Sequence, residues 1–512
     1  MACDTLSSEL PGKVFPRGSP EYIESTSSYF TAFGNKLSPV CIVQPSSSKD
    51  VSKLIKHFRA SGTKFAVRGG GHTPWGGAAN IQDGITVDMR NILGVSLSQD
   101  KKIVSIGTGE HWGSVYKVLE SKKLATVGGR VSKVGVTGLV LGGGWSFFSA
   151  QTGFVCDNVI SFEVVLASGQ IVQASKETNS DLFTALKGGS TNFGIVTRFD
   201  LPTFPSGPMW GGITAHPATV VNDFVREFYD FITSSNPDEH AHVIASVGWS
   251  ADFGMEMAIT GLYHTNTQTA DPPSSLIGFT SLEPNTFSTL RAGTLVDFTE
   301  EQSTFTVDGA RQLFFTTSVM PHLDMMLKIV EISREGLKQL QHVEKLSWSL
   351  VFQSLTKQML VHSAERGENS LGVSPDDGPM VNMLLNPTWK AAKDDDRVIS
   401  VALEVIEKTE KLAAQLGKGA KYRFLNYGYK TQNVYGGLDE KGIQKMQKVS
   451  KKYDPEGFFQ SNFVGEFKLP TSWLKFRQLI NRLEQTEGVE ASSKRTVHGA
   501  SIPVVGRPPI KL

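Results

Sequence analysis

Residues 67–77 have the sequence Val67-Arg68-Gly69-Gly70-Gly71-His72-Thr73-Pro74-Trp75-Gly76-Gly77, in which three consecutive glycines stand between a basic residue and a histidine. Where Cβ atoms are missing, backbone N–H groups can converge on phosphate oxygens, and Arg68 adds a positive charge. The segment is therefore typical of a loop that holds a diphosphate group. On its own, it is equally compatible with a surface turn that contains a bystander histidine.

A helix and a strand are predicted before this loop, and another strand after it. The helix stops at Gly62 and has apolar residues at helical spacing, namely Val51, Leu54, Ile55 and Phe58. Residues 65–67 and 85–89 are short apolar runs that favour strands. In a Rossmann domain the glycines lead from a strand into a helix, so the order found here disfavours that domain.

A second glycine-rich segment spans residues 128–145 and is too apolar for a solvated linker. We therefore expect a flat group to lie against it. Residues 157–172 follow, and they predict two strands joined by a turn at Ser168-Gly169. Residues 181–189 and 192–197 complete the ordered series.

Taken together, these segments resemble the vanillyl-alcohol-oxidase and p-cresol-methylhydroxylase flavoproteins, in particular the fungal berberine-bridge-enzyme-like oxidases. The resemblance runs from about Leu10 to Leu469 and is weakest in the middle third. It is most specific over residues 68–72, 128–144, 157–169 and 188–196. It implies FAD as the cofactor and a bond from His72 to the 8α-methyl group of the flavin.

The resemblance also implies which other residues bind the cofactor. They are Arg68, Gly69, Gly70, Gly71, Gly76, Gly128, Val134, Gly135, Thr137, Gly138, Gly142, Ile195, Val196 and Asn462. Val131 stands where many relatives have a second flavin-linking cysteine, so attachment through His72 alone is implied. Val134 matches the position that gates oxygen, and its small side chain favours an oxidase. For Asn462, a turn residue is the alternative.

Residues 421–432 resemble the family's aromatic-x-Asn-Tyr signature, whose tyrosine lies over the reactive face of the flavin; Tyr427 takes that place. A phenolate can remove a proton while the substrate transfers hydride to flavin N5. Because tyrosine has an ordinary pKa of about 10, this role needs a nearby positive charge or the electron-poor flavin. Tyr429 stands where relatives often have aspartate, which leaves the catalytic base open. Packing in an aromatic cluster is the alternative for these tyrosines.

The chain has 512 residues, a length that suggests two domains. Its 50 glycines are an excess that lies in the loops described above. Its net charge of +1 does not suggest a nucleic-acid partner. No apolar stretch reaches the ~20 residues that span a bilayer. The resemblance implies an α+β fold, with a discontinuous two-subdomain FAD-binding domain and an antiparallel-sheet substrate domain backed by helices. The predicted boundaries are 1–205 for the FAD-binding domain (flavin module about 36–205), 206–420 for the substrate domain, 421–470 for the segment that returns to the FAD domain, and 471–512 for a partly flexible extension.

Within the middle domain, residues 243–247, 255–259 and 313–318 favour strands. An apolar stripe predicts a helix that ends at Leu416-Gly417 and contains Val398, Val401, Ala402, Val405 and Leu412. Substrate is expected between the two domains. Phe314, Phe315, Met320, Met325 and Met326 would suit an apolar ligand, although most are expected in the core. Trp249, Trp348 and Trp389 are either packing residues or sugar-stacking platforms.

His111, His264 and His322 have no partners at metal-ligand spacing, so no metal is predicted. The first residues show no apolar signal region, and no Asn-x-Ser/Thr acceptor occurs in the sequence. Both features predict an intracellular, cytoplasmic protein. Secretion is left open, because Cys3 and Cys41 match a disulfide pair of secreted relatives in the family that the chain resembles. Cys156 is then unpaired. A peroxisomal location is also left open by the final Ile510-Lys511-Leu512.

The sequence thus predicts an FAD-dependent oxidase of specialised metabolism. A substrate C–H bond next to oxygen or nitrogen would lose hydride to the flavin, O2 would reoxidise it to give H2O2, and the product could then cyclise. A small molecule and O2 are the predicted partners, with no nucleic acid or membrane and an undetermined oligomeric state. Two alternatives are a carbohydrate oxidase of the same branch and a non-redox cyclase, or pericyclase, on the same fold.

Overall fold

The computed structural model of the chain describes residues 2–266, 271–465 and 467–470. Residues 1–468 form one compact unit. The second unit, residues 469–512, contains only Leu469 and Pro470 among the described residues, so the predicted extension and terminal tripeptide lie outside them. No helix in the described ranges is both long and apolar enough to cross a membrane.

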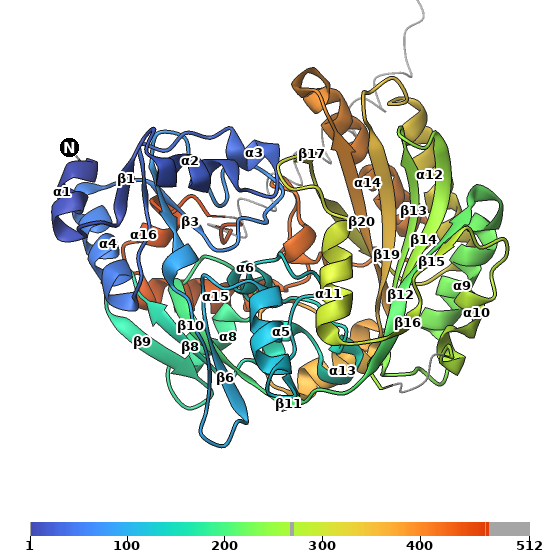
Figure 1. The fold of residues 1–512 in the computed structure, drawn as a ribbon, viewed down its shortest axis with the longest axis horizontal. Helices are drawn as coiled ribbons and strands as arrows, with labels where there is room; N and C mark the ends of the chain where they lie inside the picture. Colours follow the sequence, from blue (N-terminus) through green and yellow to red (C-terminus); the bar gives the residue numbers. More distant parts are fainter. Residues whose placement is uncertain (1, 267–270, 466, 471–512) are drawn as a thin grey trace, which may run out of the picture. The chain divides into compact units, whose positions relative to one another are not determined.

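The first glycine loop belongs to a small four-stranded sheet near the N-terminus (Figure 1). Its strands, in spatial order, are β1 (Val14–Pro16), β2 (Cys41–Val43), β4 (Ile85–Asp88) and β3 (Phe65–Arg68). Helices α1 (Ala2–Glu9), α2 (Pro20–Ser27), α3 (Ala32–Asn35) and α4 (Ser48–Ser61) accompany them. Helix α4 begins where the Ser47 side chain accepts from the Asp50 N–H and ends at Gly62, whose φ is +68°. Its four predicted core residues are fully buried, which confirms this helix.

A five-stranded antiparallel sheet forms the second part. Its order is β5 (Val95–Leu97), β6 (Ile103–Gly107), β10 (Ile195–Pro202), β8 (Ser161–Val165) and β9 (Ile171–Ser175). Strands β8 and β9 pair across the predicted Ser168-Gly169 turn, so the hairpin is confirmed. Short helices lie around this sheet and the second glycine segment, namely α5 (Trp112–Glu120), α6 (Val136–Leu141), α7 (Ser149–Thr152) and α8 (Ser180–Leu186); β7 (Leu124–Ala125) pairs with β11 (Phe204–Pro205).

The middle of the chain forms a large antiparallel sheet. Its strands run in the order β15 (Phe287–Ser288), β12 (Met209–Pro217), β14 (Met255–His264), β13 (Ala241–Ser250), β19 (Ser347–Leu355), β20 (Met380–Trp389) and β17 (Arg311–Gln312), with β16 (Arg291–Gly293) on β12 and β18 (Phe315–Val319) on β20. Helices α9 (Val221–Thr233), α12 (Leu323–Lys338) and α14 (Asp395–Gln415) pack behind it (Figure 1). Helix α11 (Leu295–Thr304) contacts α5, and the remaining helices here are α10 (Ile277–Thr280) and α13 (Lys357–Glu365). The three predicted strands and the predicted helix, which is α14, are confirmed.

After the large sheet, the chain returns to its first part through α15 (Glu440–Tyr453) and α16 (Phe458–Ser461). The rings of Phe458 and Phe463 stack on Phe65 of β3, at centroid distances of 5.6 and 5.1 Å. The predicted fold class, with a discontinuous FAD-binding part and a helix-backed antiparallel sheet, is confirmed. The individual domain boundaries stay predictions, since residues 1–468 form one unit.

Cys3 in α1 and Cys41 in β2 form a disulfide, and Cys156 is a buried free thiol. The bond ties the first helix to the small sheet across a separation of 38 residues. The one pairing that the resemblance implied, Cys3 with Cys41, is therefore present, and Cys156 is the cysteine left over.

Replacing both bonded cysteines by alanine should lower the free energy of unfolding by about 2–4 kcal/mol, because the unfolded chain regains the freedom of the closed loop. The midpoint of urea unfolding measures this. As a control, a reductant should lower the midpoint of the natural protein and leave that of the double variant unchanged. Equal midpoints for both proteins without reductant would contradict the prediction.

Candidate functional site

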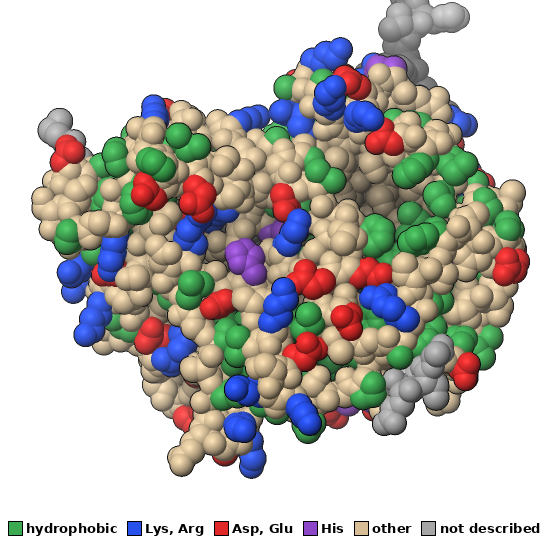
Figure 2. Space-filling model, viewed as in Figure 1, with side chains coloured by type: hydrophobic (Ala, Val, Ile, Leu, Met, Phe, Trp, Pro, Cys, Tyr) green, Lys and Arg blue, Asp and Glu red, His purple; other side chains and the backbone are tan. Residues whose placement is uncertain are grey.

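A cavity of about 730 Å³ lies between the glycine segments and the inner face of the large sheet. This volume is in the range of sites for small molecules and cofactors. Its floor comes from the loop after β3 and from residues 130–141, and its roof comes from strands β12, β13, β14, β19 and β20. Figure 2 shows that the surface is hollowed beside the large sheet, with apolar side chains gathered next to the hollow.

Bare main chain forms the cavity floor. A Cβ atom added to Gly70 would lie 2.5 Å from Cα of Gly135, and one added to Gly135 would lie 2.5 Å from Cα of Gly70. Because both neighbours are backbone, neither position accepts a side chain. A Cβ added to Gly138 would meet nothing within 4 Å, so this glycine leaves open space in the wall.

His72 lines the cavity and is partly buried. Its ring stacks on Phe30 at a centroid distance of 3.8 Å and an angle of 16°. Among the described residues, its Nε2 atom has no hydrogen-bond partner. Burial lowers the pKa of His72 to about 4. At neutral pH the imidazole is therefore uncharged, and one of its nitrogens is available for a group in the cavity.

Phe30 is itself fixed from two sides. Its N–H donates to the carbonyl of Gly71, and its own carbonyl accepts from the Gly309 N–H and from Nε2 of Gln312. The stack on His72 thus rests on both the glycine loop and the loop that enters the large sheet. This clamp limits the rotation of the imidazole.

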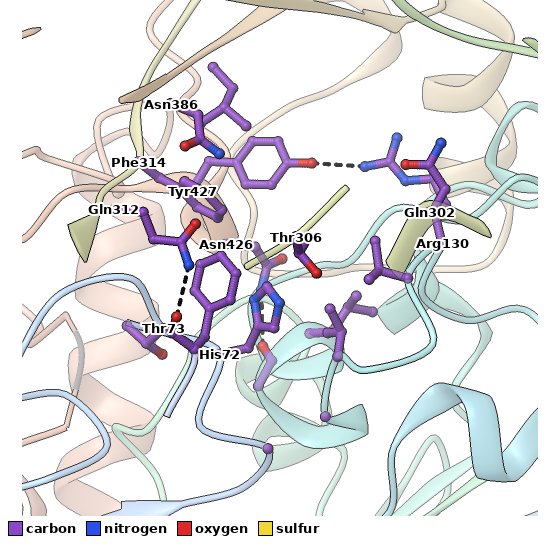
Figure 3. A pocket seen from close by; sticks show the side chains of 18 of the residues that line it. His72, Thr73, Arg130, Gln302, Thr306, Gln312, Phe314, Asn386, Asn426 and Tyr427 are labelled. Atoms are coloured by element: carbon purple, nitrogen blue, oxygen red, sulfur yellow. Dashed lines mark hydrogen bonds between the residues drawn. The ribbon is translucent and has the colours of Figure 1, made fainter. Parts of the chain in front are cut away.

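Tyr427 reaches the cavity from the return segment, and its hydroxyl faces Arg130 (Figure 3). Nη2 of Arg130 donates to Oη of Tyr427 over 2.8 Å, and Nε2 of Gln353 donates to the same oxygen over 3.1 Å. Nη1 of Arg130 donates to Oε1 of Gln353 and lies 2.9 Å from Nε2 of His242. Since arginine only donates, His242 accepts and is neutral. In agreement, burial together with the Arg130 charge lowers the pKa of His242.

Most of the predicted site residues meet at this cavity. Those that line it are Gly69, Gly70, Gly71, His72, Val134, Gly135, Thr137, Gly138, Ile195, Val196 and Tyr427. Val131, at the position of the missing cysteine, lines it as well. Among the three tryptophans considered as stacking platforms, Trp249 lines the cavity, while Trp348 and Trp389 are core residues.

Arg68 does not face the cavity. Its guanidinium donates to the carbonyls of Ser25 and Ser28, lies over the ring of Tyr29, and stands 3.7 Å from Asp88. These buried contacts hold it under the loop, so the structure does not support a diphosphate-binding charge at this position. Arg68 instead supports the backbone of the loop from below.

Five further predicted residues also lie off the cavity wall, where close packing explains them. Gly76 packs against the Phe33 carbonyl, Gly128 against Trp112, and Gly142 against Asn426; Asn462 donates to the carbonyls of Gly62 and Thr63, and Tyr429 packs on Phe315. Asn462 thus makes the contacts of a turn residue, and of the two tyrosines only Tyr427 lines the cavity.

Arg130, Gln353 and His242 were not predicted as site residues. The one available signal for Arg130 was its place in an apolar glycine segment whose only other basic residue is Lys133. Gln353 and His242 lie within strands β19 and β13, and their spacing along the chain gives no hint of a shared site. Among the described residues, no group of three or more His, Cys, Asp or Glu is placed to hold a metal ion.

Comparison with known proteins agrees with this geometry. A family model described as an FAD binding domain matches residues 39–175. The chain is 35% identical to an FAD-dependent monooxygenase of Cochliobolus heterostrophus, over 84% of this chain and 85% of that protein. Its fold is similar to BBE-like 1 of Physcomitrella patens (TM-score 0.72, 17% identity, 92% of this chain and 99% of that chain). It is also similar to a xylooligosaccharide oxidase from Myceliophthora thermophila (TM-score 0.71, 19% identity, 91% of this chain and 100% of that chain).

The relative from Cochliobolus establishes the family, and the two solved structures establish the fold. The expected FAD cofactor is supported by the domain match, and the glycine loop and cavity accommodate such a group. The chain belongs to the family of FAD-linked oxidoreductases that includes this fungal protein, and its fold is that of the vanillyl-alcohol-oxidase and p-cresol-methylhydroxylase flavoproteins, as in their berberine-bridge-enzyme-like members.

Proposed function

We propose that the protein is an FAD-dependent oxidase of specialised metabolism. A substrate C–H bond next to oxygen or nitrogen would be oxidised while Tyr427 accepts the proton from the neighbouring atom. One observation carries this proposal: a neutral His72 with an unpartnered nitrogen and a hydrogen-bonded Arg130–Tyr427 pair line the same cavity. Bound FAD would supply the hydride acceptor, and O2 would regenerate it with formation of H2O2.

His72 is proposed to hold the cofactor covalently. Its uncharged ring can act as a nucleophile, and the Phe30 stack keeps it oriented toward the cavity. Val131 offers no second link, so a single attachment is expected. The bare main chain of residues 69–71 and 135 would hold the diphosphate group.

Tyr427 is proposed as the proton acceptor because two N–H groups converge on its oxygen. The donors, Arg130 and Gln353, stabilise negative charge on that atom. The positive charge that a tyrosine base requires is therefore supplied by Arg130. The small side chains of Val131 and Val134 in the wall leave room for O2, which supports an oxidase.

A second candidate function is suggested by the relative from Cochliobolus, which is named a monooxygenase. Such a reaction would place one atom of O2 in the product, whereas an oxidase releases both atoms as H2O2. A carbohydrate oxidase is less well supported, because apolar side chains dominate the roof of the cavity. A non-redox cyclase is the remaining alternative.

Anaerobic mixing with a substrate tests these functions. An oxidase should bleach the oxidised flavin band, and subsequent O2 should yield one H2O2 per substrate without any external reductant. Turnover without bleaching would indicate a cyclase, and ¹⁸O from labelled O2 in the product would indicate a monooxygenase. Either result would contradict the oxidase proposal.

Replacing His72 with alanine should release the flavin from acid-precipitated protein, because the covalent bond is lost. In the natural protein, the flavin should stay with the polypeptide on a denaturing gel, and mass spectrometry should find it on the peptide that contains His72. His111→Ala is the matched control, since His111 lies next to the loop but does not line the cavity. An adduct on any other residue would refute the assignment.

Tyr427→Phe should slow anaerobic flavin reduction by about 10²–10⁴-fold, because the proton acceptor is removed. Tyr429→Phe serves as the control and should reduce at nearly the natural rate, since Tyr429 lies outside the cavity. Stopped-flow absorbance measures both rates. Equal effects of the two substitutions would argue against Tyr427 as the base.

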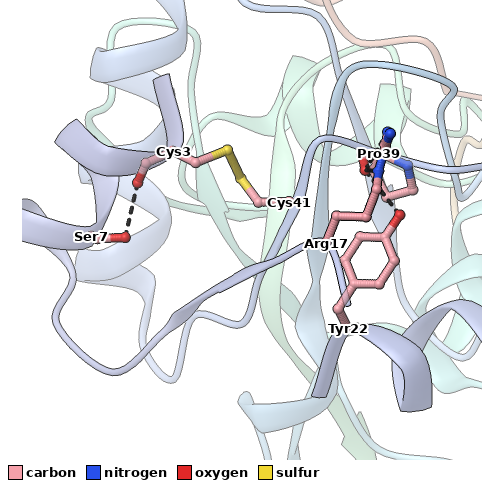
Figure 4. Close-up of a disulfide and its surroundings, with 6 residues drawn as sticks. All are labelled: Cys3, Ser7, Arg17, Tyr22, Pro39 and Cys41. Atoms are coloured by element: carbon pink, nitrogen blue, oxygen red, sulfur yellow. Dashed lines mark hydrogen bonds between the residues drawn. A yellow bond between two sulfur atoms is a disulfide. The ribbon is translucent and has the colours of Figure 1, made fainter. Parts of the chain in front are cut away.

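The cysteines bear on the location of the protein. Figure 4 shows the bond between Cys3 and Cys41. Disulfides persist in oxidising compartments and are rare in the cytosol. The disulfide therefore supports the secreted alternative, and the cytoplasmic location stays a prediction that nothing here tests.

A further inference from the structure

Arg130 is a buried cation without a matching acid. Arg130 is 9% exposed. Among the described residues, no Asp or Glu carboxylate lies within 4.0 Å of its guanidinium, whereas Arg68, Arg90, Arg311, Arg334 and Arg423 each have such a carboxylate. A buried charge is costly unless it is paired. In the described part of the chain, no carboxylate therefore balances the charge of Arg130, and a negatively charged ligand in the cavity would do so.

The neighbours of Arg130 compensate its positive charge only weakly. Gln353 and His242 offer neutral acceptors, and Tyr427 offers a hydroxyl oxygen. The ring of Trp145 adds a contact 5.6 Å from the guanidinium carbon. These groups fix the orientation of the guanidinium and leave its charge available to the cavity.

The rest of the cavity carries no compensating charge. Among the described residues that line the cavity, Arg130 is the only one of the four charged types, Asp, Glu, Lys and Arg. The large sheet lines the cavity with apolar side chains, as at Ile213, Ile244, Met257 and Leu384, and with uncharged polar ones, as at Ser246, Ser349, Asn386 and Thr388. At the open edge of the cavity, apolar side chains continue to the surface, where Phe253 is 74% and Val307 is 65% exposed.

We propose that the substrate binds as an anion, with an ionised enol, phenol or carboxyl oxygen against Arg130 and an apolar ring system along the large sheet. This inference rests on the proposed function and narrows its substrate class. A protonated amine is excluded, because the cavity would place it beside a guanidinium with no carboxylate to receive it. The anionic group is separate from the O–H or N–H group whose proton Tyr427 accepts, and it lies beside the C–H bond that is oxidised.

Matched naphthalene probes test the charge preference by calorimetric titration of the flavin-containing protein. 2-Naphthoate and 2-naphthol represent the two acidic sources, and 2-(aminomethyl)naphthalene is the cation of the same shape. Naphthoate should bind at least about 10-fold more tightly than the amine, and naphthol should fall between them. Each binding event should also shift the flavin absorption band, which locates the probe in the cavity.

Arg130→Gln should remove the preference by weakening naphthoate about 10- to 100-fold, and Arg130→Lys should keep part of it. Arg334→Gln is the matched control: Arg334 on α12 pairs with Glu256 on β14, neither residue lines the cavity, and the preference should be unchanged. Flavin content and the unfolding midpoint show whether each variant folds. If Arg130→Gln does not fold, the comparison of the natural protein with Arg130→Lys decides.

Three outcomes would overturn the proposal: equal or tighter binding of the amine, an undiminished naphthoate preference in a folded Arg130→Gln variant, or binding that leaves the flavin spectrum unchanged. Failure of the proposed function looks different. In that case no substrate would reduce the flavin, whereas the preference for anions, which calorimetry measures without turnover, would persist.

Discussion

Gly70 and Gly135 lie against each other through their main chains, and the position of the whole site depends on this contact. Neither backbone can move aside for a Cβ atom, so the approach is available to glycine alone. Two segments that are far apart in the sequence are thereby held in register. His72 lies two residues after Gly70, and Val134 and Thr137 lie on either side of Gly135 in the sequence. All three line the same cavity.

The same cavity is closed from the return segment by Asn426. Its Nδ2 donates to the carbonyl of Gly138, and its Oδ1 accepts from the N–H of Gly144, both over 3.0 Å. Gly142 leaves room for this amide, because any side chain there would overlap it. Tyr427 is the next residue, so the glycine segment also determines where the phenol enters. The second glycine cluster therefore positions a side chain as well as lining the cavity.

Local patterns were sufficient to predict most of the fold. The spacing of Val51 to Phe58 and the stop at Gly62 gave α4, and the Ser168-Gly169 turn gave the β8–β9 hairpin, because contacts between near neighbours determine both. The site was only partly predictable. Arg130 and Tyr427 are 297 positions apart, and their hydrogen bond depends on tertiary packing that no local pattern records.

Two predicted site residues that lie off the cavity wall show why the site was harder to predict. Arg68 stands beside the glycines in sequence, which suggested a role toward phosphate. In three dimensions its side chain turns under the loop toward Ser25, Ser28 and Asp88, contacts that involve elements distant in the chain. Tyr429 is only two residues from Tyr427, yet it packs on Phe315 in another direction. Neighbouring positions in an irregular segment do not share a face, so a motif locates a site more reliably than it assigns each residue within it.

The rigidity of the large sheet completes the arrangement around Arg130. His242 and Gln353 lie on β13 and β19, two paired central strands, in which Ile244 stands opposite Gln353. Side chains on such strands lose little further freedom when they bind the guanidinium. The charge is therefore held in place before any ligand arrives, in an apolar cavity that strengthens its field. A fixed cation in this setting favours whatever negative charge forms beside Tyr427, and it does so without the reorganisation that water would require.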